Sequence, residues 1–275
     1  MQPPLPFAVH RDARWRRRFG LFAIGAALLV TGACCPHDVA VYAAVGGNPS
    51  YAEPYHDYLQ ADLGESFVRV TIGEHASTAA ALAAAIRDEA SIIGALSMAR
   101  VVTIAVGEHE FSDARSQYRR RQCGGVDNQD CLRAMVALFD RYWADVSAGV
   151  LRHVPRAAAV RAMDLHHAWV NEDRNTNTVD DDREREVRGS DFEVLRDYLQ
   201  QLNASIRHHA AAWNIGVADT YGAINGPFGT DDPIAVGYID EQSRALTTKG
   251  QERIALALRR LGYAATPEAF TLDGR

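Results

Sequence analysis

The sequence predicts an α/β protein in three layers, in which a mainly parallel five-stranded sheet lies between two layers of helices. Short runs rich in apolar and β-branched residues alternate along the chain with long stretches whose apolar residues recur at helical spacing, as in parallel sheets. The chain has 275 residues, of which 47% are hydrophobic and 23% charged. It is therefore long enough to bury a large core and too apolar for a disordered protein.

Five runs are predicted as strands. The first three are followed closely by a glycine, at Gly46, Gly73 and Gly107, which is typical of a strand that turns into a loop. The five runs cover residues 39–45, 67–72, 101–106, 157–165 and 215–219.

Four stretches are predicted as helices, at residues 77–99, 131–153, 192–213 and 247–261. The first begins at Ser77 or Thr78 and the last at Thr247 or Thr248, because a hydroxyl side chain suits a helix cap. The two long stretches between them carry apolar residues at helical spacing. Residues 172–186 are acidic and without periodicity, and are predicted as a solvated loop.

Ligands of parallel α/β sheets bind at the carboxyl ends of the strands. Asn48 follows the first predicted strand, and Gly107 the third. Asp164, His166 and His167 end the fourth and are expected to line the entrance of a site at this edge.

The N-terminus is predicted to be an export signal. Four arginines between positions 14 and 18 precede an apolar run at 19–33, which is shorter than the roughly 20 residues of a membrane span. Residues 1–35 are therefore predicted as a signal peptide, 36–265 as the folded domain and 266–275 as a C-terminal tail. Residues 30–34 resemble a lipobox, which predicts a lipid on Cys34; the alternative is ordinary cleavage near Ala33 without lipidation.

The charge balance restricts the partners of this chain. The net charge is −6, and removal of residues 1–33, which hold five arginines and one aspartate, leaves −10. An acidic chain without a basic cluster beyond its N-terminus is not expected to bind nucleic acid. We expect membrane contact only through the signal peptide or a lipid anchor, and a location in the bacterial cell envelope or outside the cell. The sequence does not indicate an oligomeric state.

Cys123 and Cys131 flank a short stretch with two glycines. In an oxidising compartment a disulfide between them is favoured over a metal site, because no CxxC pair or nearby histidine completes a ligand set.

The strand ends resemble the sequence blocks of the SGNH/GDSL hydrolases, a family of serine esterases and lipases. Residues 41–48, VYAAVGGN, resemble the first block, which usually ends in Gly-Asp-Ser. Residues 73–78, 101–111 and 245–250 resemble the other three blocks. The resemblance spans residues 39–263 and implies a flavodoxin-like three-layer fold, with a Ser-His-Asp triad and an oxyanion hole at one edge of the sheet.

The residues at the reactive positions of this family are replaced. Asn48 stands at the position of the nucleophilic serine, Ala245 at that of the catalytic histidine, and Gln242 at that of the aspartate three residues earlier. Ala76 and His109 stand at the oxyanion-hole glycine and asparagine. Acyl transfer by this route needs a hydroxyl nucleophile and an imidazole base. The resemblance therefore implies a protein that is inactive as an esterase and whose old cleft binds an acylated or glycan ligand.

Two other interpretations stay open. Ser50 could act as a displaced nucleophile, with His75 or His56 as its base, which would make the chain an active esterase or lipase. His75, Glu108, His109 and Glu110 follow neighbouring strands, but their spacing matches no metal-binding motif. Neither a metal ion nor a cofactor is predicted.

Overall fold

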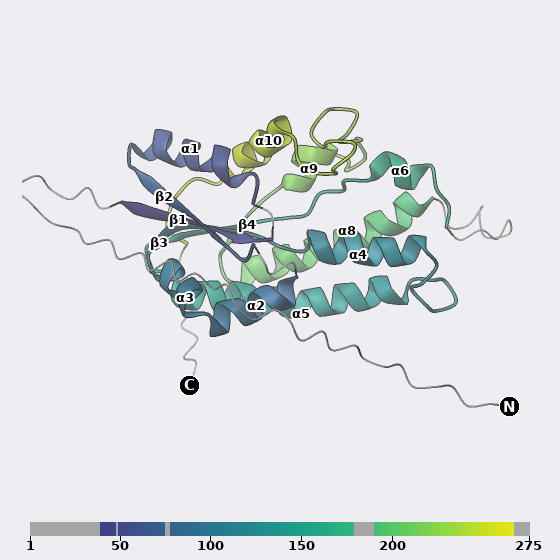
Figure 1. The fold of residues 1–275 in the computed structure, drawn as a ribbon, viewed down its shortest axis with the longest axis horizontal. Coiled ribbons are helices and arrows are strands. Elements are labelled where there is room, and N and C mark those ends of the chain that lie inside the picture. Colours follow the sequence, from purple (N-terminus) through teal and green to yellow (C-terminus); the bar gives the residue numbers. More distant parts are fainter. Residues whose placement is uncertain (1–38, 48, 75–77, 179–189, 267–275) are drawn as a thin grey trace, which may run out of the picture. The chain divides into compact units, whose positions relative to one another are not determined.

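The computed structural model describes residues 39–47, 49–74, 78–178 and 190–266. Their five strands form one parallel sheet in the order β2-β1-β3-β4-β5 (Figure 1), which confirms the predicted α/β class. This order is that of flavodoxin-like doubly wound sheets, which bind ligands at the switch point between β1 and β3. The strands are β1 (Ala40–Gly46), β2 (Phe67–Ile72), β3 (Ala99–Ala105), β4 (Ala159–Met163) and β5 (Gly216–Ala218).

Helices cover both faces of the sheet (Figure 1), and each face has its own apolar cluster. One face carries α2 (Ala79–Asp88), α3 (Ala90–Ser97), α4 (Glu108–Arg119), α5 (Asp130–His153) and α8 (Asp191–Ala212). The other carries α1 (Ala52–Leu63), α9 (Thr220–Asn225) and α10 (Thr248–Arg259). None of the helices within the described ranges is long and apolar enough to cross a membrane.

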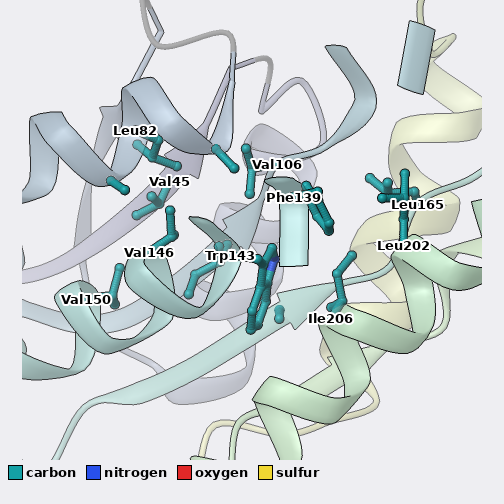
Figure 2. Close-up of a cluster of buried hydrophobic side chains, with 14 of the residues drawn as sticks. Val45, Leu82, Val106, Phe139, Trp143, Val146, Val150, Leu165, Leu202 and Ile206 are labelled. Atoms are coloured by element: carbon teal, nitrogen blue, oxygen red, sulfur yellow. The ribbon is translucent and has the colours of Figure 1, made fainter. Parts of the chain in front are cut away.

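The larger apolar cluster is built around α5. Phe139 and Trp143 are almost completely buried, and Figure 2 shows them among side chains of β1, α2 and α8. The buried residues of α5 recur every three or four positions, so one stripe of this helix faces the sheet and its neighbours. This stripe fixes α5 behind the carboxyl ends of β1 and β3, where Val45 and Val106 join the cluster.

The helical stretch predicted at 77–99 is two helices. The chain is extended at Glu89, which ends α2 and begins α3, and Ala99 already belongs to β3. Thr78, one of the two candidate caps, accepts a hydrogen bond from the Ala81 N–H of α2, and Ser77 lies outside the described residues. The Ala-rich composition favours a helix throughout but does not encode the break, because Glu89 is not a helix-breaking residue.

The prediction of a solvated loop at 172–186 is wrong in its first part. Glu172 and Asp173 belong to a short helix, α6 (Val170–Arg174), and the Asp173 side chain is fully buried. Its carboxylate forms a two-pronged ion pair with Arg115 of α4, with Nε–Oδ2 at 2.9 Å. A buried carboxylate needs such a partner, and the partner lies 58 positions away in the sequence. Residues 179–186 lie outside the described residues.

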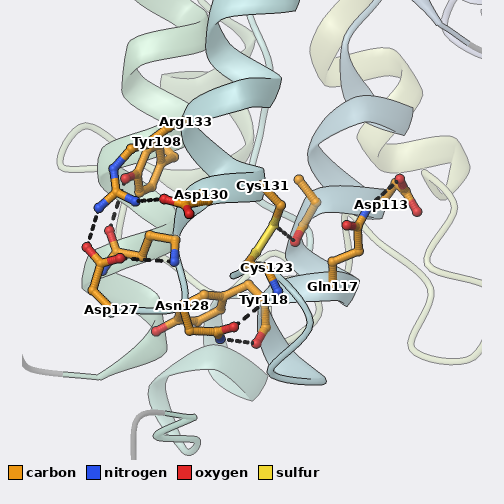
Figure 3. The surroundings of a disulfide bond; sticks show 12 residues. Asp113, Gln117, Tyr118, Cys123, Asp127, Asn128, Asp130, Cys131, Arg133 and Tyr198 are labelled. Atoms are coloured by element: carbon orange, nitrogen blue, oxygen red, sulfur yellow. Dashed lines mark hydrogen bonds and ion pairs between the residues drawn. A yellow bond between two sulfur atoms is a disulfide. The ribbon is translucent and has the colours of Figure 1, made fainter. Parts of the chain in front are cut away.

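The predicted disulfide joins Cys123 to Cys131, with their Cα atoms 4.6 Å apart (Figure 3). It closes the loop between α4 and α5. Asn128 holds the same loop from inside: its Oδ1 accepts a hydrogen bond from the Cys123 N–H (3.1 Å), and its Nδ2 donates to the carbonyl of Tyr118 (2.8 Å). The loop is therefore an ordered turn between two helices.

Loss of this disulfide is expected to destabilise the fold moderately. The bond spans a separation of eight residues, and closing so short a loop restricts the unfolded chain by about 2–3 kcal/mol. Urea unfolding of the Cys123→Ser/Cys131→Ser variant should show a loss of this size. The parent protein in dithiothreitol should match the variant; a parent whose stability is unchanged on reduction would contradict the prediction.

Candidate functional site

A cavity of about 380 Å³ opens at the carboxyl edge of the sheet, where the sequence predicts a site. It lies at the switch point between β1 and β3 and is lined by residues that follow β1, β3 and β4, by the start of α4 and by the loop before α10. Its polar lining consists of Tyr51, Glu108, His109, Ser112, Asp164, His166, Thr220, Ser243 and Arg244. A cavity of this size accommodates a small-molecule ligand.

Two glycines shape the chain at the mouth of the cavity. Gly46 has a φ of +146°, and a Cβ atom there would lie 1.8 Å from the carbonyl oxygen of Ala105. Gly107 has a φ of +121°, and its Cβ atom would collide with Phe139 and Leu165. Both positions require glycine. β1 and β3 can therefore turn sharply side by side and deliver the residues that follow them into the cavity.

Three residues of the predicted reactive blocks meet in this cavity. Gly47, His109 and Ala245 all line it, although they come from three separate segments. Gln242 and Ser50 are not among its lining residues; Gln242 is exposed on the loop before α10, and Ser50 lies in the turn before α1.

Other predicted positions fall elsewhere. Asn48, His75 and Ala76 lie outside the described residues. Glu110 turns away from the cavity, and its carboxylate accepts a hydrogen bond from the Ala79 N–H at the first residue of α2. Burial raises the pKa of Glu110, and the hydrogen bond from the Ala79 N–H opposes this rise. Glu110 therefore joins the beginnings of two helices.

Asp164 lines the cavity as a structural acceptor. It is buried, and its Oδ1 accepts hydrogen bonds from the backbone N–H groups of Thr220 (2.7 Å) and Tyr221 (2.9 Å) at the start of α9. Its Oδ2 accepts from Arg207 of α8. Burial raises the pKa of Asp164, whereas the Tyr221 N–H and Arg207 oppose the rise. Because the carboxylate joins α8 and α9 to β4, it is a poor candidate for a proton-transferring base.

His166 lines the same wall and is only partly exposed. Burial lowers the pKa of His166, and the carboxylates of Glu108 and Asp164 oppose this shift. Its imidazole is therefore neutral at pH 7, with one nitrogen that can donate a hydrogen bond and one that can accept. Ser112 follows His109 by three positions on α4 and lies on the same side of the cavity.

The loop that carries Ala245 is folded back on itself and tied to α6. The Asp240 N–H donates to the Ala245 carbonyl (2.9 Å), and the Ser243 hydroxyl donates to Asp240 Oδ1 (2.8 Å). Arg244 has a left-handed backbone, with φ of 59°, and its guanidinium lies 3.4 Å from Glu172 Oε2. Sequence reasoning did not identify Arg244 or Ser243, because no motif marks them.

His167 lies behind the cavity and does not line it, which corrects the expectation for this residue. It is fully buried between the rings of Phe111 and Phe192. Its Nδ1 accepts a hydrogen bond from the Trp169 N–H (3.2 Å), and its Nε2 lies 3.5 Å from Asp173 Oδ2. Burial lowers the pKa of His167 to about 3, and Arg115 adds to the shift.

Among the described residues, no group of three or more histidine, cysteine, aspartate or glutamate side chains is arranged to hold a metal ion. Glu108 and His109 line the cavity, but the Glu110 carboxylate is engaged at α2. The polar side chains that line the cavity can donate and accept hydrogen bonds with an organic ligand.

Comparison with known proteins gives a likeness of fold. No protein-family model matches the sequence, and no curated protein sequence matches it. The lipase Lip_vut3 from a goat rumen metagenome has a similar structure, with a TM-score of 0.62 and 15% sequence identity over 82% of this chain and 99% of that chain. Phospholipase A1 from Streptomyces albidoflavus and an extracellular lipase from Streptomyces rimosus each give a TM-score of 0.53 at 14% identity, over 81% of this chain and 99% of theirs. The chain therefore has a fold found in lipases.

Proposed function

We propose that this chain is an exported relative of the SGNH/GDSL hydrolases that has lost ester hydrolysis and keeps a ligand-binding cavity. The proposal rests on two residues that line the cavity at positions where the family has catalytic or oxyanion-hole groups. A methyl group, Ala245, stands where a proton-accepting imidazole is needed, and His109 stands where an oxyanion-hole asparagine is expected. The lipase-like fold supports the relationship.

The cavity walls favour an acylated or glycan ligand. Met163, Leu165 and Leu246 supply apolar surface, whereas His166 and Arg244 supply hydrogen-bond donors. Small-molecule sites combine a mostly apolar wall with a few fixed polar groups in this way.

The location is proposed from the sequence and supported by the structure's chemistry. A disulfide between Cys123 and Cys131 suits an oxidising compartment, and one structural neighbour is an extracellular lipase. We infer that residues 1–35 direct export and that 36–265 form the exported domain, with 266–275 as its tail. The chain is either anchored by a lipid on Cys34 or released.

The proposal is tested with residues 36–275, a p-nitrophenyl butyrate assay and a serine-reactive phosphonate. We expect no hydrolysis above the rate in buffer and no covalent phosphonate on the protein, whereas an active lipase of similar fold is labelled. The Ser50→Ala variant should behave as the parent. Phosphonate mass on Ser50, Ser112 or Ser243, lost when that serine becomes alanine, would instead establish an esterase with a displaced nucleophile.

A further inference from the structure

The amino edge of the sheet, opposite the cavity, carries exposed apolar side chains. Val39 precedes β1, Val68 lies in the edge strand β2, and Met98 directly precedes β3. Their surfaces are 54%, 50% and 64% exposed. The strand register places Val41 beside both Val68 and Ala99, so the three exposed side chains gather around the start of β1. We call Val39, Val68 and Met98 the amino-edge patch.

Positive charge accompanies this patch along the same edge. Helices of this fold run opposite to the strands, so α5 and α10 end at the amino edge, and Arg152 and Arg260 lie exposed at those ends. In the described part of the chain, no carboxylate lies within ion-pair distance of either arginine.

Two carboxylates near this edge are paired with other arginines. Asp62, near the end of α1, is paired with Arg259 (2.6 Å), and Glu65 is paired with Arg100. Arg152 and Arg260 therefore place two positive charges at this edge of an otherwise acidic chain, whose overall charge is −6. Glu89, exposed between α2 and α3, is the counter-charge on the α5 side.

The chain itself indicates what covers this edge. Only four residues, 35–38, lie between Cys34 and Val39, and the five residue steps from Cys34 to Val39 span about 17 Å when the chain is extended. A lipid on Cys34 would hold the start of β1 within that distance of a bilayer surface. An apolar patch flanked by arginines suits the surface of an anionic bilayer. The arginines are attracted to the lipid headgroups, and the apolar side chains insert beside the acyl chains.

We propose that the amino edge of the sheet, with Val39, Val68 and Met98 at its centre and Arg152 and Arg260 beside it, rests on an anionic phospholipid surface. This orientation rests on the proposed location in the cell envelope. It directs the cavity, at the opposite edge of the sheet, away from the bilayer and toward ligands that arrive from the aqueous side.

The orientation is tested by quenching at two matched positions. Both apolar clusters lie within the described residues, so residues 36–275 keep the whole described fold. Their cysteines are joined in the disulfide, so a cysteine introduced by Met98→Cys or Leu138→Cys takes a bimane label. Leu138, on α5, is 54% exposed and lies outside the patch. On vesicles of phosphatidylcholine and phosphatidylglycerol (7:3) with doxyl-labelled lipid, the label at 98 should be quenched at least threefold more than the label at 138.

A second measurement tests the charge at this edge. Arg152 and Arg141 are exposed on the same helix, 11 residues and about 16 Å apart. Each arginine at an anionic surface strengthens binding about fivefold. Arg152→Glu should therefore weaken partitioning to the anionic vesicles at least fivefold, and Arg141→Glu less than twofold.

Three outcomes would overturn the proposal: equal quenching at both positions, equal binding to vesicles of phosphatidylcholine alone, or a dimer in solution that covers the label at 98. The last would mean that a second copy of the chain occupies the patch. Mass analysis of the exported full chain tests lipidation of Cys34 separately. The esterase assay above tests the cavity separately, so failure of either proposal can be told from failure of the other.

Discussion

The variant Asn48→Ser/Gln242→Asp/Ala245→His is expected to hydrolyse a short-chain p-nitrophenyl ester at least about 10³-fold faster than the parent chain. Gly47, which precedes position 48 in the chain, and Ala245 line the same cavity, so an imidazole at 245 would stand at its wall. Gly46 and Gly107 keep the sharp turns that bring β1 and β3 together there. Initial rates of p-nitrophenol release measure the gain.

The matched control is Gln242→Asp/Ala245→His with Asn48 retained, which should stay at the parent's rate because it lacks a nucleophile. Adding His109→Asn to the triple variant should raise the rate by a further 10²-fold or so, since one oxyanion-hole donor is worth about that much. A triple variant that folds with the parent's stability and remains silent would contradict the idea that the cavity is a former esterase site.

The pH dependence of stability is expected to reveal the buried His167. Its pKa is about 3 in the folded protein, against 6.5 for an ordinary histidine. Between about pH 3 and pH 6.5, the unfolded chain therefore binds a proton at this histidine and the folded protein does not. The stabilisation is fully present above pH 6.5 and is lost as the pH falls toward 3, at about 1.4 kcal/mol per pH unit.

The contribution of His167 to the pH dependence of stability must be separated from the contributions of neighbouring carboxylates. Burial raises the pKa of Asp173 and of Asp164, so both carboxylates favour folding at lower pH and oppose the effect of His167. Urea unfolding at pH 6.5 and 4.5 should show that the parent loses about 2–3 kcal/mol more than His167→Gln over this interval. His208→Gln, at an exposed position on α8, should keep the slope of the parent. Equal slopes for the parent and His167→Gln would contradict the prediction.

The sheet could be predicted from the sequence because each strand is a continuous apolar run bounded by turn residues. The helices α1 and α4 could not, because their buried faces are narrow: α1 buries Ala52, Tyr55 and Leu59, and most of its other residues are polar. Capping and periodicity located α5, α8 and α10 to within a residue or two. The local sequence pattern is thus sufficient to locate a helix when a broad face of that helix is buried.

The candidate site was predictable in part for the same reason. The blocks after β1 and β3 and before α10 mark the positions of Gly47, His109 and Ala245, and the structure brings these together. The ion pairs of Glu172 could not be predicted, because its partners are Arg119 of α4 and Arg244 of the loop before α10. These contacts depend on segments that meet only in three dimensions.

The ring closed by Cys123 and Cys131 has a consequence for proteolysis. Val126 lies inside this ring and is fully exposed, so the loop tip is open to proteases. A single cut between residues 124 and 130 would leave the two fragments, one with α4 and one with α5, joined by the disulfide. A protein nicked there would migrate as one band without reductant and as two with it.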